Sequence, residues 1–167
     1  MLQCHWLINS LYLLYKGKIM THNNLSEKIR ITDLLSEGKS VQLHPQGYSM
    51  YPLIVPDRDE VIIVPVKNHK IRRGDVLLYR RKNGKLILHR VYRVKNEKLY
   101  FAGDNESVVE GPLEMSQIEG IMVSFIRKGK KYKISNILYF IYWQLWLLVL
   151  PFRKNIGKAV HKIKSGS

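Results

Sequence analysis

Cysteine is almost absent from this sequence: Cys4 is the single one among 167 residues. One cysteine cannot close a disulfide framework, and it excludes a metal site built from several thiolates. The histidine, aspartate and glutamate residues show no metal-ligand spacing. We therefore expect neither a metal ion nor an organic cofactor.

Acidic residues are also scarce, with 13 Asp and Glu against 28 Lys and Arg, and none follows Glu119. A net charge of +15 favours a polyanionic partner, either nucleic acid or an anionic membrane surface. Most of the C-terminal basic residues flank an apolar segment and do not alternate with aromatic residues along a strand. No nucleic-acid partner is therefore expected, and a non-catalytic basic nucleic-acid-binding module is kept as an alternative.

The sequence lacks the uninterrupted run of about 20 apolar residues that a spanning helix needs. The stretch Trp6–Tyr15 is too short to span, and no positive charge precedes it as in a signal peptide. Residues 1–19 are interpreted as a short apolar leader, a peripheral anchor, or an over-read upstream of a true start at Met20.

A second apolar stretch, Ile137–Phe152, has Gln144 as its one strongly polar member and is apolar on every side. It is predicted to be a membrane-associated helix followed by a basic amphipathic tail, so that residues 137–164 contact membrane lipids. A buried core helix or a helix docked in a dimer are the alternatives. Whether the segment spans or lies flat stays open, and the protein is predicted to be membrane-associated, at the cell membrane.

The middle of the chain is rich in short β-branched runs separated by turn residues such as Asn83-Gly84. A helix is predicted at 25–37, ended by Gly38. The pattern predicts a mainly β fold: a small antiparallel coiled-sheet or barrel-like domain at 20–135, with an N-terminal helix and, in 136–167, a C-terminal hydrophobic helix. The predicted strands are Val41–Leu43, Glu60–Pro65, Val76–Tyr79, Leu86–Val94, Leu99–Ala102 and Ile118–Arg127.

Three short segments carry side chains suited to nucleophilic catalysis. Ser49 stands in Gly-Tyr-Ser-Met-Tyr-Pro directly after a predicted strand, where a tight turn would expose its hydroxyl and offer backbone N–H groups to an oxyanion. His89 lies inside an apolar strand, and histidine is the usual general base for a serine because its pKa lies near neutrality. Asp104, in Gly-Asp-Asn, could accept the second N–H of that histidine. Each segment alone is also typical of an ordinary turn or strand.

Together, the order Gly-x-Ser-Met-x-Pro, Gly-Asp-Val, His-Arg-Val and Gly-Asp-Asn resembles type I signal peptidases over residues 38–127. The resemblance is to their endoplasmic-reticulum, archaeal and spore-former variety, in which histidine replaces the lysine base. It implies a mostly β fold with Ser49 as nucleophile, His89 as general base and Asp104 as orienting acid. Glu110 is the alternative third member, since the family's second aspartate is missing here.

The resemblance also implies the residues that hold the oxyanion and the substrate: Gly47, Tyr48, Met50, Leu86 and Leu88. An extended substrate would lie against 42–48 and 86–88. Gly47 stands where many signal peptidases have an oxyanion-binding serine, so a backbone amide would have to replace it.

The predicted function is a serine endopeptidase that cleaves signal or leader peptides from a peptide or preprotein substrate at the membrane. A leader peptidase on the cytoplasmic side, acting on a small secreted peptide, is the alternative enzyme. The related LexA-like repressors cleave themselves with a lysine base and carry a helix-turn-helix. This chain has His89 at that position and room for one helix before the peptidase segment, so a repressor is not expected.

Overall fold

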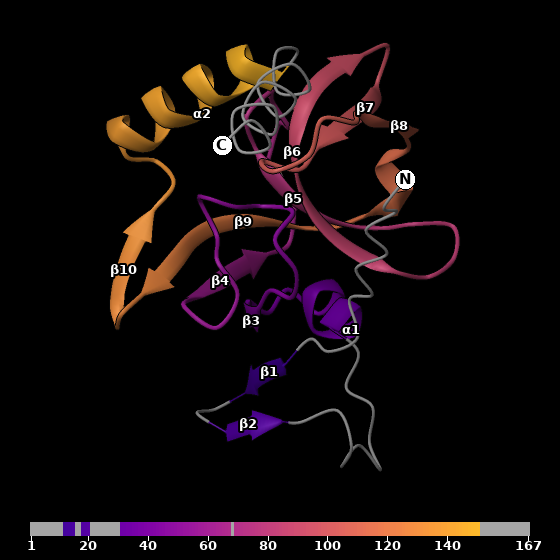
Figure 1. Cartoon of the computed structure of the whole chain (residues 1–167). Helices are drawn as coiled ribbons and strands as arrows, with labels where there is room; N and C mark the ends of the chain where they lie inside the picture. The colour runs from indigo at the N-terminus through magenta and orange to yellow at the C-terminus, as the bar shows by residue number, and fades with distance from the viewer. Residues whose placement is uncertain (1–11, 16–17, 21–30, 68, 151–167) are drawn as a thin grey trace, which may run out of the picture.

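The computed structural model describes residues 12–15, 18–20, 31–67 and 69–150, and the fold is built on a single antiparallel sheet of ten strands. Along the sheet the order is β2-β1-β3-β4-β9-β5-β6-β7-β8, and β10 pairs with β9 off this path (Figure 1). The strands are β1 (Tyr12–Tyr15), β2 (Lys18–Met20), β3 (Val41–His44), β4 (Asp59–Val64), β5 (Val76–Arg80), β6 (Leu86–Lys95), β7 (Lys98–Ala102), β8 (Glu110–Leu113), β9 (Ile118–Arg127) and β10 (Lys130–Lys133).

The predicted mainly β, antiparallel class is confirmed, and the six predicted strands are present with ends shifted by one residue at most. Alternation drives this result, because every second residue of β4 is buried while the others are partly exposed. The sheet coils so that its apolar face encloses two clusters, one around Val61 and Met122 and the other around Tyr79 and Phe101.

Four strands were not predicted: β1 and β2, which fall in or next to the predicted leader, and β8 and β10. β8 contains Gly111-Pro112, a dipeptide that usually argues against a strand, and it lies at the edge of the sheet, where proline is tolerated. β10 is Lys-Lys-Tyr-Lys, whose side chains are all exposed, so it has no buried alternation to detect. β8 and β10 both exist because a neighbouring strand supplies hydrogen-bond partners.

Two α-helices and a 3-10 turn, η1 (Met115–Gln117), accompany the sheet. α1 spans Ile31–Ser36 and buries Leu34 and Leu35; the earlier part of the helix predicted at 25–37 lies outside the described residues, as do residues 1–11 of the predicted leader. β1 and β2 fall in or next to that leader.

α2 spans Ile137–Val149 and packs across the end of the sheet that carries β6 and the loop after β7 (Figure 1). Its first turn is capped by Asn136, whose side chain accepts a hydrogen bond from the Leu138 N–H at 2.8 Å. Within the described residues, no helix has both the length and the apolar character needed to cross a membrane. The remainder of the predicted 136–167 segment, from residue 151 onward, lies outside the described residues.

Candidate active site

Ser49 stands in a tight loop directly after β3, which we call the Ser49 loop (residues 45–50). The turn needs Gly47, whose φ of +81° lies in the left-handed region that side chains disfavour. Met50 is buried, and the Ile54 N–H donates to its carbonyl at 2.9 Å, which ties the loop to the core. Ser49 itself is partly exposed, and no acceptor in the described chain takes its backbone N–H.

The loop after β7 (residues 103–106) holds the Ser49 loop in place. The Asn105 N–H donates to the Ser49 carbonyl at 2.7 Å. Gly103 permits this approach, because a Cβ at that position would lie 2.7 Å from the same carbonyl oxygen. Two segments more than fifty positions apart in the sequence are thereby fixed together, as the predicted catalytic arrangement requires.

His89 lies on β6 with only 2% of its surface exposed, and its Nδ1 is 3.2 Å from the Tyr79 hydroxyl. That hydroxyl donates its hydrogen to Glu110 Oε2 at 2.6 Å, and Arg81 Nε binds the other Glu110 oxygen at 2.6 Å. Since the single hydroxyl hydrogen of Tyr79 goes to Glu110, the hydroxyl accepts from His89, and Nδ1 must carry a hydrogen. This assigns the tautomer in which Nε2 has a free lone pair, the form that a general base needs.

Burial and neighbouring charges keep the hydrogen-bonded residues His89, Tyr79 and Glu110 in distinct charge states. Burial lowers the pKa of His89 to about 4, against a smaller opposite effect of Glu110, so the imidazole is neutral near pH 7. Burial and Glu110 raise the pKa of Tyr79. For Glu110, burial would raise the pKa, but the hydrogen bonds from Arg81 and Tyr79 outweigh burial and lower it.

Glu106 is a site residue that the sequence did not single out. Its Oε1 lies 3.7 Å from Nε2 of His89, and its side chain packs against Gly103 beside the Ser49 carbonyl. Burial raises its pKa. Within the described residues no hydrogen bond joins Ser49 to His89 directly, and Glu106 is the group that faces the basic nitrogen.

Asp104 does not occupy the position expected of an orienting acid. Its two oxygens accept from Arg90 Nε at 2.8 Å and Nη2 at 2.7 Å, and both side chains are almost fully buried. Tyr142 donates to the same carboxylate at 3.3 Å, and Trp146 Nε1 donates to the Asp104 carbonyl at 2.7 Å. Of the two predicted acids, the alternative one, Glu110, is linked to His89 through Tyr79. Asp104 anchors α2 to the 103–106 loop.

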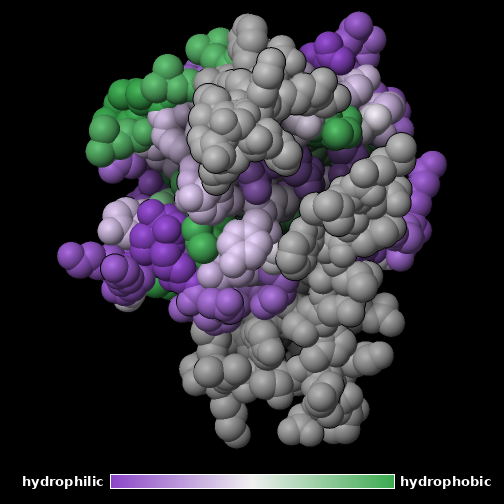
Figure 2. All heavy atoms as spheres, in the orientation of Figure 1, coloured by the Kyte–Doolittle hydropathy of each residue, from purple (hydrophilic) through white to green (hydrophobic). Residues whose placement is uncertain are grey.

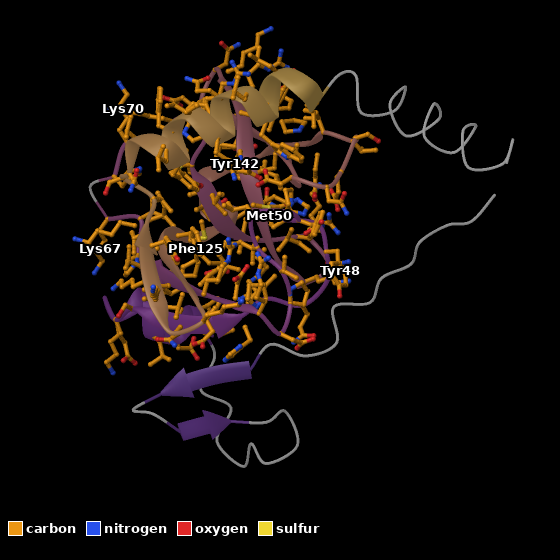
Figure 3. The ribbon with its side chains drawn as sticks, turned by 60° about the vertical axis from the view of Figure 1, so that its left-hand side comes forward. Tyr48, Met50, Lys67, Lys70, Phe125 and Tyr142 are labelled. Atoms are coloured by element: carbon orange, nitrogen blue, oxygen red, sulfur yellow. The ribbon has the colours of Figure 1, made fainter. Side chains whose placement is uncertain are left out.

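An apolar pocket opens beside Ser49. Gly47, Met50, Leu86 and Leu88 line it together with Ser49, so four of the five residues predicted to hold the oxyanion or substrate surround one space. The fifth, Tyr48, is 53% exposed and points outward, whereas Met50 points into the molecule (Figure 3).

The substrate-binding edge predicted along 42–48 is partly occupied. β1 pairs with β3 from Gln42 to His44, which leaves the Ser49 loop uncovered by that ladder. On the other side, β6 pairs with β5 at Leu86–Leu88, but its ladder with β7 begins only at Arg90. Within the described strands, the second edge of β6 at Leu86–Leu88 is therefore unpaired beside the pocket.

Comparison with known proteins gives one match. The sequence model described as Peptidase S24-like matches residues 16–123, well over half of the chain and including Ser49 and His89. No curated protein and no solved structure matches.

Proposed function

Because the chain belongs to the Peptidase S24-like family, we propose that it is a serine endopeptidase with Ser49 as nucleophile and His89 as general base. The observation that carries this proposal is the series of hydrogen bonds behind His89, in which the Tyr79 hydroxyl accepts the Nδ1 hydrogen and donates its own hydrogen to Glu110. A general base that accepts a proton at Nε2 needs this tautomer, whereas a histidine with only a structural role does not.

In the proposed reaction, Ser49 Oγ attacks the scissile carbonyl while His89 Nε2 takes the hydroxyl proton. The Ser49 N–H donates to the oxyanion, in the role that Gly47 cannot fill with a side chain. The imidazolium then protonates the leaving amine, and water hydrolyses the acyl-enzyme with the same base. Ser49 Oγ and His89 Nε2 come within about 3 Å when substrate binds, as is common for catalytic contacts that are long in the free enzyme.

The substrate we propose is a leader or signal peptide in extended conformation. It would add as a strand to the unpaired edge of β6 at Leu86–Leu88 and run past the Ser49 loop. The apolar pocket between Met50, Leu86 and Leu88 would accept an apolar side chain next to the cut. Main-chain pairing would then supply affinity, and the pocket would supply selectivity.

The test is cleavage of a panel of exported precursors and small leader-bearing peptides by the detergent-purified full chain, with products identified by mass spectrometry. Wild type is compared with Ser49→Ala and His89→Ala. We expect a defined cut with wild type and its loss in both variants.

Matched controls come from the same chain. Ser107→Ala removes an exposed serine near the site, and His69→Ala removes an exposed histidine that binds Asp75. Both should cleave at the wild-type rate. Equal behaviour of all five proteins on every substrate would refute the peptidase proposal, and salt-dependent binding to DNA would then be measured for the alternative binding module.

A further inference from the structure

α2 is apolar on both of its faces, and only one of them is packed. The packed face carries Tyr139, Tyr142, Trp143, Trp146 and Leu147, spaced as one helical stripe. The opposite face carries large hydrophobic side chains that are between 47% and 72% exposed: Ile137, Leu138, Phe140, Ile141, Leu145 and Leu148. We call these six residues the outer face of α2; it forms the green patch in Figure 2.

The packed face holds α2 in a fixed rotation. The Tyr139 hydroxyl accepts from Arg90 Nη1 at 2.9 Å, and Tyr142 and Trp146 bind Asp104. Trp143 packs so closely on Gly74 that a Cβ there would lie 2.6 Å from its ring. These contacts extend along the helix, so α2 cannot turn its outer face inward without breaking them.

A contiguous aliphatic and aromatic surface of this kind is uncommon on a solvated protein and usually marks an interaction site. The stripe Ile137, Ile141, Leu145 and Leu148 runs the whole length of the helix, with no charged side chain anywhere in α2. Whatever binds the outer face of α2 must therefore present an apolar region to it.

The basic residues around α2 indicate that the partner of this face is also negatively charged. The charged residues of the turn and strand leading into α2 are all exposed lysines, namely Lys128, Lys130, Lys131 and Lys133. The sequence continues after α2 with Arg153 and Lys154. Lys67 and Lys70 project on the side of the molecule where α2 begins (Figure 3). A second copy of this chain would bring two such basic rims together, whereas a surface of anionic headgroups would neutralise them.

We propose that the outer face of α2 binds the surface of an anionic lipid bilayer, with the helix lying in the membrane plane. The packed face stays on the sheet, so lipid contacts one side of the helix only, as in an interfacial amphipathic helix. The surrounding lysines bind the headgroups. Since Asp104 and Asn105 join α2 to the Ser49 loop, the candidate active site is held next to the lipid surface.

The experiment measures partition of the full chain onto vesicles by flotation, with phosphatidylcholine alone and with phosphatidylcholine mixed with phosphatidylglycerol. All proteins carry Ser49→Ala, so the result is independent of peptidase activity. Ile141→Ser and Leu145→Ser are each expected to lower partition about 5- to 10-fold. Lys131→Gln is expected to lower it about 5-fold on the anionic vesicles alone.

Two control variants make the same kinds of substitution at exposed positions away from α2: Met115→Ser on η1 and Lys82→Gln in the β5–β6 turn. They should bind as the parent does. Because the outer-face side chains are exposed, their variants should keep the parent's circular dichroism and melting temperature.

The proposal is overturned if the parent does not float with anionic vesicles, or if outer-face and control variants bind equally. It is also overturned if light scattering shows a dimer that Ile141→Ser and Leu145→Ser dissociate while vesicle binding is absent. In that case the outer face is covered by a second copy.

Discussion

Replacing Tyr79 by phenylalanine removes the hydroxyl that links His89 to Glu110 by hydrogen bonds. The ring, which stacks on Phe101 with centroids 4.5 Å apart, would be retained, so the core keeps its shape. What disappears is the acceptor for the Nδ1 hydrogen and the donor to Glu110. The base can then adopt either tautomer and can rotate.

The size of the effect follows from the hydrogen bonds. A hydrogen bond that involves a charged group contributes about 1.5–3 kcal/mol, which corresponds to roughly a 10- to 150-fold lower kcat if it is needed to hold the base. KM should change little, because Tyr79 is fully buried and does not line the pocket beside Ser49. The unpaired buried groups should also lower the free energy of unfolding by about 1–3 kcal/mol.

The assay combines peptide cleavage kinetics with nitrogen NMR of the imidazole. In wild type, Nδ1 should show a protonated and Nε2 an unprotonated signal near pH 7, and Tyr79→Phe should mix the two tautomers. Tyr92→Phe is the control, since Tyr92 lies on β6 with its ring facing Arg73. An unchanged kcat, or a loss confined to KM, would refute the positioning role of Tyr79.

Four further predictions concern pH and packing. Because the pKa of His89 falls from 6.5 to about 4 on folding, the stability it contributes is full above pH 6.5 and is lost as the pH falls to 4, by about 3 kcal/mol in urea unfolding. For the same reason, kcat/KM should fall on the acid side with an apparent pKa near 4. Asp104→Asn should lower the free energy of unfolding by about 3–5 kcal/mol, because it leaves Arg90 buried without its counter-charge. Gly103→Ala should reduce kcat by displacing the Ser49 carbonyl, and should cost about 1–3 kcal/mol in the same unfolding assay.

Controls for these changes use exposed counterparts. Asp75→Asn breaks an ion pair with His69, whose side chain is 45% exposed, and should alter stability by less than about 1 kcal/mol. His89→Gln should remove the loss of stability between pH 6.5 and 4 that wild type shows. If that loss persists in His89→Gln, a different group titrates in this range and the assignment to His89 is wrong.

Much of the fold could be predicted from local pattern. Strands such as β4 have a strict alternation of buried and partly exposed residues, and that alternation is visible in the sequence because it reflects a single buried face. The Ser49 loop and His89 were also detectable, since a glycine-framed serine and a histidine within an apolar strand are local features. β10, with four exposed residues, offered no such signal and depends on β9 for its existence.

The partners of these residues depended on the tertiary structure. Asp104 and Glu110 were both acidic residues in a turn region, and nothing local distinguishes the one that binds Arg90 from the one that reaches His89. The difference arises because β5, β6 and β8 bring Tyr79 and Glu110 together across 31 positions of sequence. Glu106 likewise became a site residue only because its loop folds against His89.

The same distinction between local sequence and tertiary structure applies to α2. Its apolar composition was plain in the sequence, and with it the expectation of an unusual environment. Which six side chains stay exposed was decided by Arg90, Asp104 and Gly74, which bind the opposite face. Hydrophobicity and alternation are properties of short segments, so the sequence determined them alone; pairing of charges and the choice of a buried face are properties of distant segments in contact, which only the folded chain specifies.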